Sequence, residues 1–151
     1  MIINSCKKTN QSPIQSLFTG GTWQLASILA YNYIGNQQTS IDTLNNPCAL
    51  DQYFTFNKDN TCTYSNYSCK SQPVSSGQWS LSPNQLFLMA DMTCSTDTSA
   101  NFKPFINAQI INLGQFSMIL NTGDIQPNYS LTRKRRILQY GFIRQKSAVT
   151  N

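Results

Sequence analysis

The chain has 151 residues, a net charge of +5, 40% hydrophobic residues and 11% charged residues. A chain of this length fits one domain and buries roughly 70% of the surface that it exposes when unfolded, so it can form a hydrophobic core. It contains no His and no Glu, and its six acidic residues are therefore all Asp. These absences exclude the catalytic triads and metal sites that depend on His, and we expect neither a metal ion nor a cofactor.

The first residues resemble the end of a bacterial lipoprotein signal. Ile3 stands three positions before Cys6, and the small residue Ser5 directly precedes it. The resemblance implies that Cys6 becomes the acylated N-terminus and anchors the protein in the bacterial cell envelope, on the periplasmic or surface face of the outer membrane. Residues 1–16 would then be a signal remnant and a tether, with one helical turn that starts at Pro13. The alternative is a frayed N-terminus with an incidental thiol.

The rest of the chain has the pattern of an all-β protein. Turn residues recur about every 8–12 positions, and sustained helical periodicity is missing. A polar stretch over about 34–47 predicts a long first loop, and 137–144 is expected to be a ninth strand or a docked tail. The eight expected core strands lie, in chain order, at about 21–31, 50–56, 62–64, 78–81, 85–89, 104–113, 115–121 and 128–133. Sequential strands leave two unpaired edges unless they close, so we expect an eight-stranded antiparallel up-and-down barrel over 17–146, followed by a disordered tail over 147–151.

The clearest hairpin turns at Lys58-Asp59-Asn60. Asn60 tolerates the left-handed conformation that a three-residue turn needs. This turn places Phe56 beside Cys62 and Phe54 beside Tyr64.

The same hairpin bears on the cysteines. Apart from Cys6 the chain has four, for which three disulfide pairings are possible. Extending the hairpin brings Cys48 close to Cys69, so this pairing is favoured, and elimination then leaves Cys62–Cys94.

Strand alternation predicts which side chains point into the barrel. These are mostly aromatic and aliphatic residues: Phe54, Phe56, Tyr64, Trp79, Leu81, Leu88, Phe116 and Met118. They would bind a small apolar or amphipathic molecule by burying its surface, with the 34–47 loop at the mouth of the barrel. Because these side chains are bulky and the chain is short, the alternative is a barrel interior that is already filled.

Several short motifs follow one another along the chain. The opening contains Gly21-Thr22-Trp23, a Gly-x-Trp motif, and the second strand has the pattern Cys-x-x-Asp-x-x-Phe-x-Phe from Cys48 to Phe56. Two further motifs are Ser76-Gly77-Gln78-Trp79 and Leu131-Thr132-Arg133-Lys134. Together these motifs resemble the lipocalin-like domain family of small Bacteroidetes-type lipoproteins over about residues 17–134. This resemblance implies a lipocalin-like barrel in which Gly21 and Trp23 belong to the closed end. An Arg of the last strand, Arg133 or else Arg144, would stack on Trp23 and complete the closure.

The function that we expect is a lipid-anchored binding module for a small apolar ligand, without enzymatic activity. The alternative is a filled barrel that contacts a partner or a glycan through its loops. An enzyme ranks last, because Asp59, Asp97 and Asp124 lie in turn contexts.

The basic run 133–136 is expected to be a solvated turn or strand end; it contains no aromatic residue, so we expect no nucleic-acid partner. We also expect a monomer.

Overall fold

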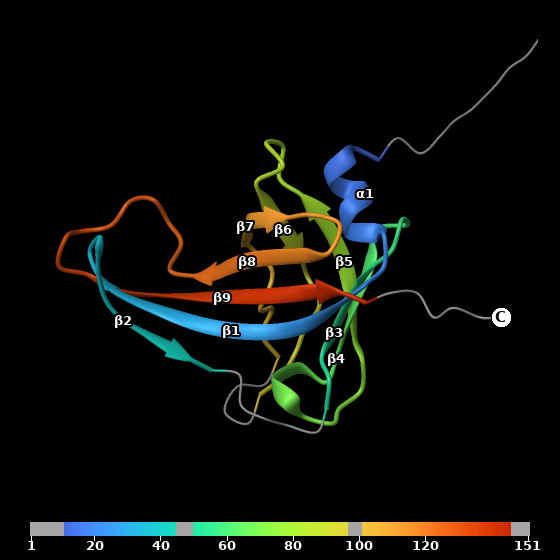
Figure 1. Cartoon of the computed structure of the whole chain (residues 1–151), viewed down its shortest axis with the longest axis horizontal. Coiled ribbons are helices and arrows are strands. Elements are labelled where there is room, and N and C mark those ends of the chain that lie inside the picture. Colours follow the sequence, from blue (N-terminus) through green and yellow to red (C-terminus); the bar gives the residue numbers. More distant parts are fainter. Residues whose placement is uncertain (1–10, 45–49, 97–100, 146–151) are drawn as a thin grey trace, which may run out of the picture.

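A computed structural model describes residues 11–44, 50–96 and 101–145 (Figure 1). The elements in chain order are α1 (Pro13–Thr19), β1 (Thr22–Ile34), β2 (Gln37–Thr43), β3 (Tyr53–Phe56), β4 (Thr61–Ser65), the short 3-10 helix η1 (Tyr67–Cys69), β5 (Ser75–Leu81), β6 (Phe87–Ala90), β7 (Ala108–Leu113), β8 (Ser117–Gly123) and β9 (Lys134–Arg144). Within these described ranges, nine antiparallel strands form one sheet in the order β2-β1-β3-β4-β5-β6-β7-β8-β9, and β1 also pairs with β9. The β1–β9 pairing closes eight strands into a barrel, which confirms the predicted fold, and leaves β2 as an additional strand.

Closure depends on the length of β1 and on one irregularity within it. β1 pairs with β9 from Trp23, opposite Arg144, to Ile34, opposite Lys134. The register shifts between Leu25 and Ser27, so the inward side of β1 changes at this point. Trp23 is buried before the shift and Ala30 after it.

The expected loop over 34–47 is instead mostly a hairpin, so this part of the prediction is wrong. β1 continues to Ile34, the chain turns at Gly35, and β2 pairs back along β1. All seven residues of β2 are exposed, so its sequence carries none of the hydrophobic alternation that identifies a half-buried strand. Residues 45–47 of the expected loop lie outside the described residues.

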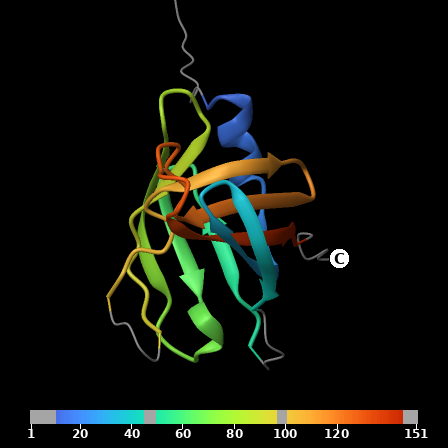
Figure 2. The ribbon, with the colours of Figure 1, turned by 90° about the vertical axis from the view of Figure 1, so that its left-hand side faces the viewer.

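β2 belongs to a ribbon that extends past the barrel, which we call the arm. The arm consists of β2, residues 29–34 of β1 and residues 134–139 of β9. Figure 1 shows it projecting to the left, and in Figure 2 it points toward the viewer, with β2 in front of the barrel.

The last barrel strand also differs from the prediction. The expected strand at 128–133 is a connection, and β9 occupies 134–144. The segment 137–144, expected as a ninth strand or a docked tail, is therefore part of the strand that closes the barrel. This shift decides which arginine reaches Trp23.

The helix α1 covers one end of the barrel (Figure 1). It begins as predicted at Pro13, and Ser12 and Gln15 form a capping box across its first turn. Phe18 is fully buried, with its ring centre 4.9 Å from that of Phe56 and 5.5 Å from that of Trp79. Among the described residues, no helix has the length and apolar character needed to cross a membrane.

Candidate ligand site at the open end of the barrel

Trp23 and Arg144 close the end of the barrel that lies under α1. The indole Nε1 of Trp23 donates a hydrogen bond to the carbonyl oxygen of Phe18 at 3.1 Å. The guanidinium carbon of Arg144 lies 4.4 Å from the centre of the Trp23 ring, and its Nη2 donates to the carbonyl oxygen of Leu17. A Cβ atom at Gly21 would lie 3.3 Å from the Cγ atom of Arg144, so Gly21 leaves room for the arginine stem.

Arg133, the first choice for this stacking role, does not perform it. Its side chain is 56% exposed and lies 3.7 Å from the Asp124 carboxylate. Because the last strand begins after Arg133 and ends at Arg144, the second of the two candidate arginines covers the indole.

The predicted interior side chains fill the half of the barrel next to α1. Six of the eight are buried: Phe54, Phe56, Tyr64, Trp79, Leu88 and Met118. The Phe54 ring alone lies within 4.2–5.3 Å of the rings of Phe56, Tyr64 and Phe105, measured between ring centres. Leu81 is half-buried and packs against this cluster. This half of the interior is therefore packed with aromatic rings.

Phe116 is a wrong prediction, because its side chain is 74% exposed. It precedes Ser117, the first residue of β8, and therefore lies in the turn rather than in the strand. Strand alternation holds for Met118 and Leu120, which are both buried, but does not extend into the turn.

The opposite end of the barrel contains a cavity of about 330 Å³, which we call the mouth cavity. Its lining comes from β1, β9, η1 and the segments that flank the strands: Ile28, Leu44, Gln52, Tyr67, Ser68, Thr96, Leu138 and Tyr140. None of the eight predicted interior residues is among them. The mouth cavity is thus separate from the side chains that were predicted to bind the ligand.

The polar side chains that line the mouth cavity are uncharged, and three of them, Gln52, Tyr67 and Tyr140, have hydrogen-bond partners. The Tyr64 hydroxyl, below the cavity, donates to Oε1 of Gln52 at 3.0 Å. The hydroxyl oxygens of Tyr67 and Tyr140 lie 3.4 Å apart. Burial is the main cause that raises the pKa of both Tyr67 and Tyr140, so they stay neutral phenols at physiological pH.

Sequence reasoning did not identify this set. Gln52 was the one available signal, because it is a polar residue on the inward-facing side of the strand that contains Phe54 and Phe56. Tyr67 and Tyr140 carry no local signal, since a turn and the last strand, 73 residues apart in the chain, bring them together.

A second cavity, of about 340 Å³, lies on the outer side of the Tyr67–Tyr140 pair. It is formed between the segment 102–107 and strands β8 and β9. Tyr67, Leu138 and Tyr140 line both cavities, so these three side chains form the wall between them.

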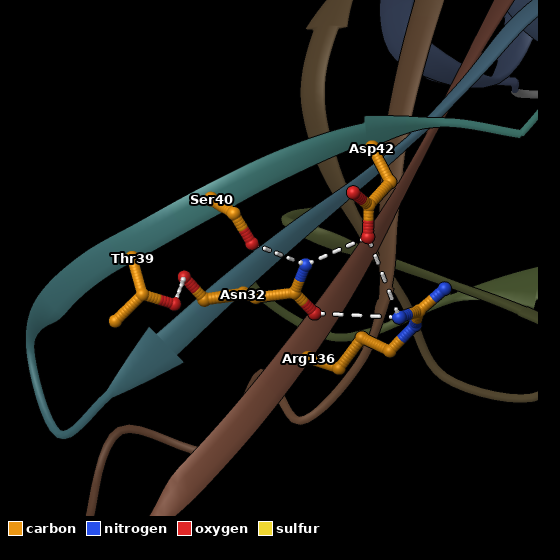
Figure 3. Close-up of polar contacts among 5 residues, drawn as sticks. All are labelled: Asn32, Thr39, Ser40, Asp42 and Arg136. Atoms are coloured by element: carbon orange, nitrogen blue, oxygen red, sulfur yellow. Dashed lines mark hydrogen bonds and ion pairs between the residues drawn. The ribbon is translucent and has the colours of Figure 1, made fainter.

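The basic run 133–136 is exposed except at Arg135. Arg135 is only 9% exposed; its guanidinium carbon lies 3.7 Å from the centre of the Tyr129 ring, and its Nη1 donates to the carbonyl oxygen of Gly35 at 2.7 Å. Arg136 donates to Oδ1 of Asn32 at 3.3 Å and lies 3.9 Å from the Asp42 carboxylate (Figure 3). The expected solvated run is therefore correct for Arg133, Lys134 and Arg136, but not for Arg135.

The predicted Cys62–Cys94 disulfide is wrong, because both residues are free and buried. The elimination argument assumed that every cysteine pairs, but the Cys62 thiol instead packs against the Met92 sulfur at 4.0 Å. Burial, with smaller contributions from Asp91 and Cys94, raises the pKa of the Cys62 thiol to about 12. Cys6 and Cys48 lie outside the described residues, so the roles predicted for them stay predictions.

Within the described part of the chain, no cluster of three or more Cys or Asp side chains could hold a metal ion.

A closed antiparallel barrel with one plugged end and one open, partly apolar end defines the class of small ligand-binding barrels. The family model of the lipocalin-like domain matches residues 20–113, which is more than half of the chain. The chain therefore belongs to the lipocalin-like domain family, whose barrel is the fold of a binding module. A comparison with curated proteins gave no match. The match ends with β7, and the structure adds β8 and β9 to the same barrel.

Proposed function

We propose that the protein binds a small, largely apolar molecule that carries one or two hydrogen-bonding groups, and that the mouth cavity holds it. The observation that carries this proposal is the cavity of about 330 Å³ at the open end of a lipocalin-like barrel. Ile28, Leu44 and Leu138 provide apolar walls, and burying ligand surface against them contributes about 25 cal/mol per Å². Ligand pockets are about 300–1,000 Å³, so a cavity of this size suits a small ligand.

The polar groups support a ligand with hydrogen-bonding capacity. Gln52, Tyr67 and Tyr140 lie at the cavity surface and are uncharged. Gln52 can exchange its hydrogen bond with Tyr64, and the two phenols their bond with each other, for a hydrogen bond to a ligand. In this proposal the predicted interior residues act indirectly: their packed rings form a rigid floor beneath the ligand.

The test is a titration with 1-aminoanthracene, a small fluorescent apolar amine, against the wild type and one variant that fills the cavity. Ile28→Trp places a larger side chain in the mouth cavity and so reduces its volume. It leaves the second cavity, of about 340 Å³, unchanged, because Ile28 does not line that cavity. We expect saturable binding by the wild type and at least a tenfold weaker affinity in Ile28→Trp. Leu131→Trp is the matched control, because Leu131 is 71% exposed in the connection before β9, and it should bind like the wild type.

A thermal unfolding measurement must first show that Ile28→Trp is folded. If it is not, Leu138→Phe is the second cavity-filling variant, because Leu138 also lines the mouth cavity. The dye's own emission should be followed, because Trp23 and Trp79 lie at the plugged end, far from the proposed ligand. Absence of saturable binding by the wild type, or equal affinity in the cavity-filling variants, would contradict the proposal.

We also propose that Cys6 is acylated and anchors the barrel in the cell envelope. The support is the sequence Ile3-Asn4-Ser5-Cys6, and residues 7–12 separate this cysteine from the start of α1. Mass spectrometry of the membrane fraction should find a diacylated or triacylated N-terminal Cys6, and Cys6→Ser should release the protein from that fraction. An unmodified Cys6 in the membrane fraction would contradict the anchor.

The pairing Cys48–Cys69 remains our proposal for a disulfide. Its support is that Cys62 and Cys94 are free, whereas the Cys69 sulfur lies 4.0 Å from the carbonyl oxygen of Leu50, two residues after Cys48. Non-reducing peptide mapping should recover one cross-linked peptide that contains Cys48 and Cys69. A Cys69 that is alkylated without prior reduction would rule the pairing out.

A further inference from the structure

Barrel closure removes the unpaired edges of a sheet. β2 is not one of the eight strands that close the barrel, and it therefore adds an unpaired strand edge to the molecule. β2 pairs with β1 along one edge, and among the described residues no strand pairs with its other edge. Figure 1 shows this second edge facing outward, on the side of the arm away from β1 and β9. A monomer was expected from the sequence, but an open strand edge such as this one can pair with another strand.

The hydrogen-bonding pattern shows which backbone groups of β2 face outward. The amide of Leu44 donates to the carbonyl oxygen of Ile28 at 2.8 Å, so the backbone of Leu44 faces β1. Antiparallel pairing alternates these directions residue by residue. The backbone groups of Asp42 and Ser40 therefore face β1, and those of Ile41 and Thr43 face away from it.

The side chains of the arm hold β2 in place and leave that edge open. Nδ2 of Asn32 donates to Oγ of Ser40 and to Oδ2 of Asp42, each at 3.0 Å, and Arg136 reaches the same carboxylate from β9 (Figure 3). All these contacts run from β2 back toward β1 and β9. The strand is thus fixed by one edge and presents the other in a formed, extended conformation.

β2 also lacks most of the devices that prevent edge pairing. Its sequence, Gln37-Gln38-Thr39-Ser40-Ile41-Asp42-Thr43, contains no Pro, no Lys and one charge. A bulge at Thr39 limits the regular outward edge to its second half. Ile41 is 49% exposed in the middle of this half.

We propose that two copies of the chain associate by antiparallel pairing of β2 with β2 of the second copy, about a two-fold axis at Ile41. In this register Ile41 faces Ile41 of the second copy and Ser40 faces Asp42. No like charges are opposed, and the exposed isoleucines cover each other. Shifting the axis by one residue to Asp42 would oppose two carboxylates, so charge selects the Ile41 register.

This contact is small, because one strand pair buries less surface than the 1,200–2,000 Å² of a stable interface. The dimer is therefore weak and requires a high protein concentration. It leaves the mouth cavity and its lining unoccupied, so it is independent of the proposed ligand.

The test uses the two-fold axis, because a residue on the axis meets its own copy. Ile41→Lys and Ile41→Glu each oppose two like charges, so each variant alone should be monomeric in sedimentation velocity at about 0.5 mM. An equimolar mixture of the two variants places Lys opposite Glu and should restore the dimer. Variants that had lost their fold would not dimerise on mixing, so this result separates a loss of pairing from a loss of folding. Ile111→Lys on β7 is the matched control, with the same residue type at 47% exposure, and should dimerise like the wild type.

Ile41→Pro tests the backbone bonds separately. It removes an outward-facing amide without removing a β1–β2 hydrogen bond, and it should also yield a monomer. A wild type that stays monomeric at about 0.5 mM would overturn the proposal, and so would a dimer that persists in Ile41→Lys and Ile41→Glu. In the first case the edge is free for an extended segment of another protein, and in the second the contact lies elsewhere.

Discussion

Arg144 joins three parts of the molecule that are distant in sequence. Its guanidinium covers the indole of Trp23 at the start of β1 and donates to the carbonyl oxygen of Leu17 in α1, while its own backbone belongs to the end of β9. A cation over an aromatic face contributes about 0.5–2 kcal/mol, and a hydrogen bond from a charged group adds to it. Arg144 therefore holds α1, β1 and β9 together.

We expect Arg144→Met to lower the free energy of unfolding by about 1–3 kcal/mol, because it keeps the apolar stem and removes the charge and the donor. Urea denaturation followed by tryptophan fluorescence measures this loss. Arg133→Met is the control, because the exposed side chain of Arg133 forms an ion pair with Asp124 and the substitution keeps the backbone hydrogen bonds of this residue. Its effect should stay within about 0.5 kcal/mol. Equal losses in the two variants would show that Arg144 has no special role in closure.

At the scale of elements, the arm depends on the turn between β1 and β2. Gly35 has φ of +60°, and a Cβ atom there would lie 2.4 Å from the carbonyl oxygen of Leu131. The carbonyl oxygen of Gly35 accepts the hydrogen bond of the buried Arg135. Gly35 thus fixes the β1–β2 turn against the connection that leads into β9.

We expect Gly35→Ala to destabilise the protein by about 1–3 kcal/mol, because the left-handed conformation is costly for Ala and the backbone must move to avoid the clash. Hydrogen exchange should show faster opening of the β2 amides that face β1. Gly114→Ala is the matched control, since a Cβ atom at Gly114 meets no heavy atom within 4 Å, and its effect should stay within about 0.5 kcal/mol. Unchanged exchange in β2 of Gly35→Ala would show that the turn does not hold the arm.

At the scale of the whole molecule, the core contains several buried phenol and thiol groups that are uncharged at neutral pH. Burial is the largest cause that raises the pKa values of Tyr64, Tyr67, Tyr140 and Cys94, and it raises that of Cys62 to about 12. Each of these groups is neutral when protonated, and burial favours the neutral form. Because its pKa is higher in the folded state, each group keeps its proton to a higher pH there than in the unfolded state.

Stability should therefore fall in alkaline solution. Below about pH 8 both states are protonated and the contribution is complete. Above it, the unfolded chain releases protons that the folded chain retains, first from its cysteines and then from its tyrosines, and unfolding becomes more favourable as pH rises. We expect urea midpoints to be constant from pH 7 to about 8 and to decline above that pH. Tyr67→Phe removes one of these groups and should make the decline shallower relative to its own value at pH 7. A midpoint that rises between pH 9 and 11 would contradict this assignment.

The sequence determined the local structure of this protein, because alternation and turn chemistry act over a few residues. It predicted the all-β class, the start of α1 at Pro13 and the hairpin of β3 and β4, in which Phe54 pairs with Tyr64, Phe56 pairs with Cys62 and Asn60 has the left-handed φ of 70°. The Gly-x-Trp motif correctly indicated the family.

The tertiary structure decided the features that need contacts between distant segments. Arg144 instead of Arg133 covers Trp23 because β9 starts one residue after Arg133, and β2 forms because β1 supplies its partner edge rather than because its own side chains are buried. Gln52, Tyr67 and Tyr140 meet at the mouth cavity because closure brings η1 and the segment before β3 next to β9. Such positions depend on where strands begin, shift and close, and these properties arise from the assembled barrel instead of from any single stretch of the chain.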